Sequence, residues 1–187
     1  MKEYVSDFLY LQNYIYVGDF TRSNHKKNMV AFEWKIDTPT KKDSRGRIYI
    51  FVETDSIGIK KINKVGKSND KSGLIGTISS YTSTLSGSPS ITRFSLHHLI
   101  RKKIDEGKKI SVFVKFIGSV KAIVEGITTQ KEVLVPLDVT YFEKQILDDY
   151  KKLFGCFPEW NFQESGKQVS IDLIDKFTTF IKNKRVK

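Results

Sequence analysis

Three consecutive residues, Gly66, Lys67 and Ser68, have the types that end a nucleotide-binding P-loop. In that loop an earlier glycine stands five residues before the second one, so that backbone N–H groups can surround the phosphates. Lys61 occupies that position here, and no glycine-rich dinucleotide motif follows any strand-like segment. The Gly-Lys pair therefore does not predict a nucleotide site, and its chemistry must come from residues elsewhere in the chain.

The charge of the chain points to a polyanionic partner. Its 32 Lys and Arg residues exceed its 21 Asp and Glu residues, which gives a formal net charge of +11. Phosphate groups bind such a surface favourably because condensed counterions are released. Nucleic acid is therefore the leading class of partner, and the alternative is a lysine-rich surface that only keeps the protein in solution.

The composition is typical of one globular domain. The chain has 187 residues, of which 39% are hydrophobic and 28% charged. Its apolar runs are much shorter than the roughly 20 residues of a membrane-spanning helix, and the N-terminus does not resemble a secretory signal. We therefore expect a cytoplasmic protein. The single cysteine, Cys156, excludes an internal disulfide and a multi-cysteine zinc site.

The apolar patterns predict an α+β fold with a small, mainly antiparallel sheet flanked by helices. Residues 48–53 and 59–66 are strand-like and surround the turn-forming segment "TDSIG", which indicates a β-hairpin. The remaining patterns predict strands at 29–36, 110–117 and 133–140, and helices at about 70–83, 92–106, 141–154 and 170–182.

This hairpin resembles the core of the GIY-YIG endonuclease family. The segment "RIY", which ends at Tyr49, and the segment "KVG", from Lys64 to Gly66, stand where the two family motifs stand. The continuation "VGKSND" is similar to the family's run into the first helix. Tyr81 on that helix, Glu143 on a later helix and Asn161 in "FPEWN" follow in the family's order.

The resemblance implies hydrolysis of DNA phosphodiester bonds with one divalent metal ion. Glu143 would hold Mg²⁺ or Mn²⁺, since these ions prefer oxygen ligands. Tyr49 would orient or deprotonate the attacking water, and Lys64 would supply positive charge beside it. Lys67 would meet the DNA backbone, and Tyr81 would hydrogen-bond the scissile phosphate or the water.

The resemblance also assigns roles to two residues near the DNA. Gly66 would let the chain pass close to the phosphate because it has no side chain. Asn161 is expected among the DNA-binding residues and as a brace of the site.

Thr77 departs from the family pattern. It stands four residues before Tyr81, where the family has an arginine that stabilises the transition state. Threonine cannot neutralise a phosphoryl oxygen, and the loss of such a cation commonly costs several kcal/mol in the barrier, or about 10³-fold or more in rate. Three hypotheses follow: an inactivated variant, which we favour; an enzyme that recruits another cation, for which Arg93 and Arg101 are candidates; and a relative that only binds nucleic acid.

Together these features predict a sequence-specific double-stranded DNA endonuclease, most like the compact type II restriction enzymes of the family. A non-catalytic nucleic-acid-binding module on the same fold is the alternative, and an RNA-binding protein is a third possibility. Cleavage of both strands by a single-site enzyme suggests a homodimer on a palindromic site. We expect neither a nucleotide cofactor nor a membrane among its partners. Within a single domain, we expect residues 1–45 to be an N-terminal extension with a strand, residues 46–162 the catalytic core, and residues 163–187 a basic C-terminal helix.

Overall fold

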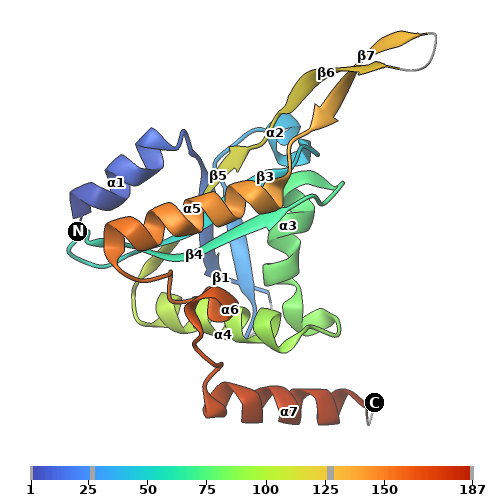
Figure 1. The fold of residues 1–187 in the computed structure, drawn as a ribbon. Helices are drawn as coiled ribbons and strands as arrows, with labels where there is room; N and C mark the ends of the chain where they lie inside the picture. The colour runs from blue at the N-terminus through green and yellow to red at the C-terminus, as the bar shows by residue number, and fades with distance from the viewer. Residues whose placement is uncertain (1, 26–27, 126–128, 186–187) are drawn as a thin grey trace.

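The computed structural model describes residues 2–25, 28–125 and 129–185. Its centre is an antiparallel five-stranded sheet with the strand order β2-β1-β5-β3-β4. Helices cover the sheet (Figure 1), so the predicted α+β class with a mainly antiparallel sheet is confirmed. The last two residues of the expected C-terminal segment, 186–187, lie outside the described residues.

The sheet strands are β1 (Ile15–Arg22), β2 (Val30–Trp34), β3 (Arg47–Thr54), β4 (Lys60–Ser68) and β5 (Lys109–Phe116). A separate hairpin consists of β6 (Ser119–Glu125) and β7 (Gln130–Pro136). The helices are α1 (Lys2–Leu11), α2 (Thr38–Lys42), α3 (Gly73–Thr82), the short 3₁₀ helix η1 (Thr84–Ser86), α4 (Ile91–Asp105), α5 (Val139–Phe154), α6 (Phe162–Ser165) and α7 (Ile171–Arg185).

Strand β3 separates two hydrophobic cores because its side chains alternate between the faces of the sheet. Tyr49 and Phe51 pack with apolar residues of α3 and α4. Ile48 and Ile50 pack on the opposite face with residues of α1 and α5. The tyrosine of the "RIY" segment therefore faces the α3–α4 layer, while Glu143 comes from the helix on the other side.

The predicted hairpin and the helices that follow it are confirmed. Strands β3 and β4 pair with Tyr49 opposite Gly66, and β4 leads through a short turn into α3. At the C-terminus, α7 packs on α4 through contacts of Phe94 with Phe177 and Phe180.

Residues 1–45 contribute two strands to the sheet, and strand β1 was not predicted. Gly18 and Asp19 interrupt its apolar pattern, with a register irregularity between Tyr16 and Gly18. Asp19 is nevertheless buried, because its carboxylate accepts hydrogen bonds from Tyr16 and Ser111 and pairs with Lys109. A polar residue can be buried when residues of another strand supply its hydrogen bonds. Such a residue interrupts the alternation of apolar and polar residues by which a strand is predicted from sequence.

The hairpin of β6 and β7 projects from the body of the molecule (Figure 1). Four large apolar side chains are exposed on it: Val120, Ile123, Leu134 and Val135. Among the described residues, every helix is too short or too polar to cross a membrane.

Candidate functional site

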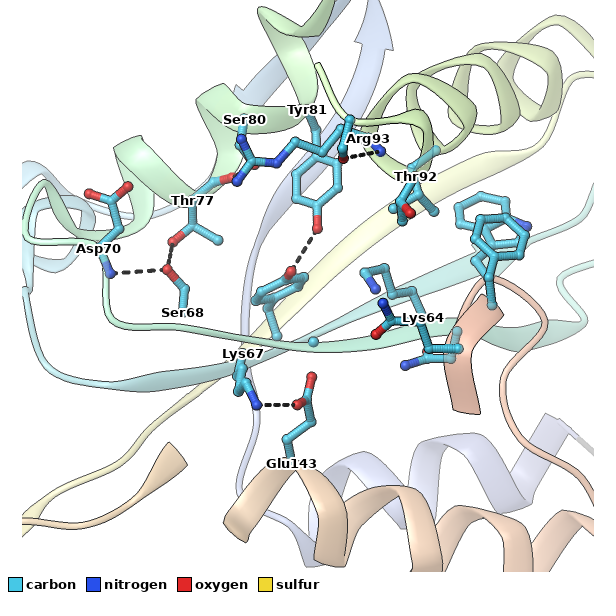
Figure 2. Close-up of a pocket in the computed structure, with 18 of the residues that line it drawn as sticks. Lys64, Lys67, Ser68, Asp70, Thr77, Ser80, Tyr81, Thr92, Arg93 and Glu143 are labelled. Carbon is cyan, nitrogen blue, oxygen red and sulfur yellow. Dashed lines mark hydrogen bonds and ion pairs between the residues drawn. The ribbon is translucent and has the colours of Figure 1, made fainter. Parts of the chain in front are cut away.

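The residues that the sequence singled out line one cavity of about 480 Å³ along the edge strand β4. Its walls come from β3, β4, the N-terminal parts of α4 and α5, helix α3, and the segment that follows α5 (Figure 2). All eight predicted site residues lie here: Tyr49, Lys64, Gly66, Lys67, Thr77, Tyr81, Glu143 and Asn161.

Two tyrosines meet at the centre of the cavity. The hydroxyl groups of Tyr49 and Tyr81 lie 2.6 Å apart and share a hydrogen bond (Figure 2). Burial raises the pKa of Tyr49 to about 12 and raises the pKa of Tyr81 well above its ordinary value. Both phenols are therefore protonated at neutral pH in the free protein.

Gly66 makes room for the Tyr49 ring. A Cβ atom at position 66 would lie 2.4 Å from Cζ and 2.5 Å from the hydroxyl oxygen of Tyr49. Strand β4 therefore passes across the phenol at a distance that only glycine permits. The observed neighbour of Gly66 is the tyrosine opposite it in the hairpin, and its approach to a DNA phosphate stays a prediction.

On the expectation from the sequence that this site cleaves DNA, Gly66→Ala should reduce the cleavage rate about 100-fold, because a displacement of about 1 Å at a reacting group has effects of this size. The crowding would lower the free energy of unfolding by only about 1–3 kcal/mol. Single-turnover cleavage and urea unfolding would measure the two effects. Gly118→Ala is the matched control, since no heavy atom lies within 4 Å of a Cβ built there. Equal activity of both variants would show that Tyr49 needs no such clearance.

Asn161 braces strand β4 from the side. Its amide nitrogen donates to the carbonyl oxygen of Val65 at 2.8 Å, and its amide oxygen accepts from the Val65 N–H at 2.9 Å. Only 2% of Asn161 is exposed, so both ends of the amide are committed to the backbone next to Gly66. The geometry is that of a brace, and direct contact of Asn161 with DNA stays a prediction.

We expect Asn161→Ala to lower the free energy of unfolding by about 2–4 kcal/mol, because it leaves two buried backbone groups without partners. The exposed residue Asn183 on α7 provides a control, and Asn183→Ala should change stability by less than about 0.5 kcal/mol. Urea unfolding of both variants measures the difference. A loss at position 161 no larger than the loss at position 183 would contradict the bracing role.

Glu143 enters the cavity from α5 and forms an ion pair with Lys67 of β4 at 3.1 Å (Figure 2). Within the described ranges, no group of three or more His, Cys, Asp or Glu side chains could hold a metal ion. The carboxylates of Asp70, Glu143 and Glu164 line the cavity, and Glu143 is the one that α5 contributes opposite Lys67. One carboxylate together with water and substrate phosphate oxygens is a common way of binding Mg²⁺, so this donor fits the expected metal ion.

Lys64 contributes a second cation on β4. Burial lowers its pKa, and the nearby carboxylates of Glu164 and Glu143 oppose this shift. Its side chain lines the same cavity as Tyr49. Positive charge at this point agrees with the expectation for Lys64, whose catalytic role stays a prediction.

Thr77 is buried and engaged within the protein. Its hydroxyl oxygen lies 2.9 Å from the Ser68 hydroxyl and 3.2 Å from the carbonyl oxygen of Gly73, and its one proton is shared between these two partners. Behind it lies the guanidinium of Arg47, which donates to the backbone oxygens of Asp70 and Arg45. Thr77 thus ties the β4–α3 turn together and carries no charge into the cavity.

Several lining residues were not singled out as site residues from the sequence. They include Ser68, Asp70, Ser80, Ser90, Thr92 and Glu164. The sequence analysis also did not predict the role of Arg47, which is fully buried and supports the turn before α3. The two-residue alternation of β3 places Arg47 on the same face as Tyr49. That alternation is the one signal in the sequence that indicated it.

Comparisons with known proteins give a fold and no family. No family model matches the chain, and no curated protein does. Among solved structures, a mutant of bacteriophage T4 EndoII aligns with a TM-score of 0.52 at 14% sequence identity, over 83% of this chain and 97% of that chain. The restriction endonuclease HPY188I in complex with product DNA aligns with a TM-score of 0.46 at 20% identity, over 82% of each chain.

Proposed function

We propose that this chain is a double-stranded DNA endonuclease, of the GIY-YIG type and most like a type II restriction enzyme. The observation that carries the proposal is that Tyr49, Tyr81, Lys67 and Glu143, which come from four different elements, line one cavity. A fold shared with EndoII, an endonuclease, supports it. The net charge of +11 supports a nucleic acid as the partner.

Different residues of the cavity have different roles in the proposed hydrolysis. Tyr49 orients the attacking water, and its deprotonated form, a small fraction at neutral pH, accepts the proton of that water. Tyr81 holds the Tyr49 oxygen through their shared hydrogen bond. Lys64 and Lys67 place positive charge on the walls of the cavity, where a phosphodiester group carries negative charge. As the water oxygen bonds to phosphorus, the bond to the 3′-oxygen breaks.

Glu143 would hold the divalent metal ion, Mg²⁺ or Mn²⁺. The bound ion supplies positive charge that stabilises the leaving oxygen. In the protein alone, the carboxylate is paired with Lys67, so metal binding must compete with this ammonium group. Release of Lys67 from Glu143 frees its side chain for the DNA backbone.

A non-catalytic nucleic-acid-binding module is the second candidate. The uncharged Thr77 at the position of the expected arginine favours it, because the basic surface would remain while the catalytic set is incomplete. The two candidates share the fold and the partner and differ in whether phosphodiester bonds break.

Incubation with Mg²⁺ and long duplex DNAs of varied sequence, beside duplex RNA of similar length, tests the proposal. We expect discrete DNA fragments, intact RNA, and DNA binding that weakens as salt is raised. Salt-sensitive binding to DNA without cleavage would support the binding module instead. Preferential binding to duplex RNA would favour the third possibility, an RNA-binding protein.

We also propose that two copies act together on a palindromic site. The exposed apolar side chains of the β6–β7 hairpin support association with another protein surface. The molecular mass of the complex with a cleavable duplex, measured by light scattering, checks this. A mass of one subunit per duplex would contradict it.

A further inference from the structure

Arg93 lies at the point of the cavity where the site lacks a cation. It is on the first turn of α4, it is exposed, and it lines the cavity together with Tyr49, Tyr81 and Thr77. Figure 2 shows its side chain reaching from α4 past Tyr81 toward Ser80 and Thr77. The guanidinium thus approaches from a second helix the region that an arginine at position 77 would occupy.

The charge of Arg93 is available to a ligand. Within the part of the chain that the structure describes, the arginine ion pairs are those of Arg22, Arg45 and Arg101, and none involves Arg93. A cation in the first turn of a helix is unfavourable in the field of the helix dipole. An anion bound there would be attracted by both the arginine and the helix N-terminus.

Electrostatic effects agree with this placement. Burial is the main cause of the raised pKa values of Tyr49 and Tyr81, and the positive charge of Arg93 opposes the rise at both phenols. Arg93 therefore acts on the two hydroxyl groups at the centre of the site.

The other two arginines that might serve are committed elsewhere. Arg47 is fully buried, does not line the cavity, and donates to the backbone oxygens of Asp70 in the turn before α3 and of Arg45 before β3. Arg101 lies two turns farther along α4, pairs with Asp105 at 3.9 Å, and lines hollows beside α7.

We propose that Arg93 binds the non-bridging oxygens of the scissile phosphate and replaces, from α4, the arginine that Thr77 does not provide. The inference rests on the proposed endonuclease function. Arg93 stays protonated throughout, while the attacking water gives its proton to the base and the leaving 3′-oxygen takes one from solvent. Its planar fork can donate two hydrogen bonds to one phosphate.

Single-turnover cleavage by the unmodified chain and by Arg93→Ala, Arg93→Lys and Arg101→Ala tests the proposal. We expect Arg93→Ala to cleave about 10²–10³ times more slowly. Arg93→Lys should have an intermediate rate, because it keeps the charge and loses the fork. Arg101→Ala should stay within about threefold of the unmodified chain, and methylguanidinium added to Arg93→Ala should restore part of the rate.

The outcomes separate this inference from the function on which it rests. Cleavage by Arg93→Ala within about threefold of the unmodified chain would overturn the role of Arg93 and leave the endonuclease standing. A chain that binds duplex DNA but never cleaves it would overturn both. Because Arg93 is exposed, Arg93→Ala should keep the circular dichroism and melting temperature of the unmodified protein, and the rescue by methylguanidinium requires a folded site.

Discussion

Glu143→Gln is expected to reduce DNA cleavage by at least about 10³-fold while leaving duplex binding in metal-free buffer within a few-fold of normal. The change keeps the size of the side chain and removes the carboxylate charge that pairs with Lys67. Without it a divalent cation has no anionic ligand at this wall, and the stabilisation of the leaving oxygen is lost. Single-turnover rates across a range of Mg²⁺ concentrations measure the effect.

Glu159→Gln is the matched control for Glu143→Gln. Glu159 also pairs with a lysine of β4, Lys61, but does not line the cavity. Its substitution should change the rate by less than about threefold. If Glu143→Gln cleaved as fast as Glu159→Gln, the metal ion would have to be held elsewhere.

Tyr49→Phe is expected to reduce cleavage by about 10²–10⁴-fold, the range typical of a lost general base. The pH dependence gives a sharper readout. Because the pKa of Tyr49 is raised to about 12, its deprotonated fraction below that value grows about tenfold per pH unit. The logarithm of the rate should therefore rise with pH between 6 and 9 without reaching a plateau.

The rise should be absent or shallower in Tyr49→Phe, because phenylalanine cannot accept a proton. Tyr150→Phe is the control, since burial also raises the pKa of Tyr150 to about 12 but its hydroxyl lies outside the cavity and donates to the Ile62 carbonyl. A pH profile of Tyr49→Phe parallel to that of the unmodified chain would leave Tyr49 only an orienting role.

The sequence predicted the parts of the fold whose patterns are regular. Strands β3 and β5 have dense β-branched and aromatic residues, and β4 follows β3 across the turn-forming segment "TDSIG". Helices α4 and α5 repeat apolar residues at helical spacing. Strand β1 was missed because its buried Asp19 depends on partners that are distant in sequence. Local patterns cannot indicate a polar residue that a neighbouring strand satisfies.

The members of the candidate site were predicted better than their contacts. The order of the motifs along the chain was enough to predict that Tyr49, Tyr81 and Glu143 belong to one site, and all three line one cavity. The contact of Gly66 with the phenol ring depends on the register of the β3–β4 hairpin, and the direction of Arg93 depends on how α4 packs beside α3. The spacing along the chain determines neither. The structure also gives a reason for an uncharged residue at position 77, because the cationic side chain of an arginine there would lie beside the buried guanidinium of Arg47.

The most direct test is the Mg²⁺-dependent cleavage of duplex DNA by the unmodified chain, with Thr77 in place, beside Glu143→Gln at equal occupancy of the DNA. The account predicts discrete fragments from the unmodified chain, none when the metal ion is chelated, and a rate at least about 10³-fold lower for Glu143→Gln. DNA that is bound by both proteins and cut by neither, or cut equally by both, would contradict a catalytic centre in this cavity.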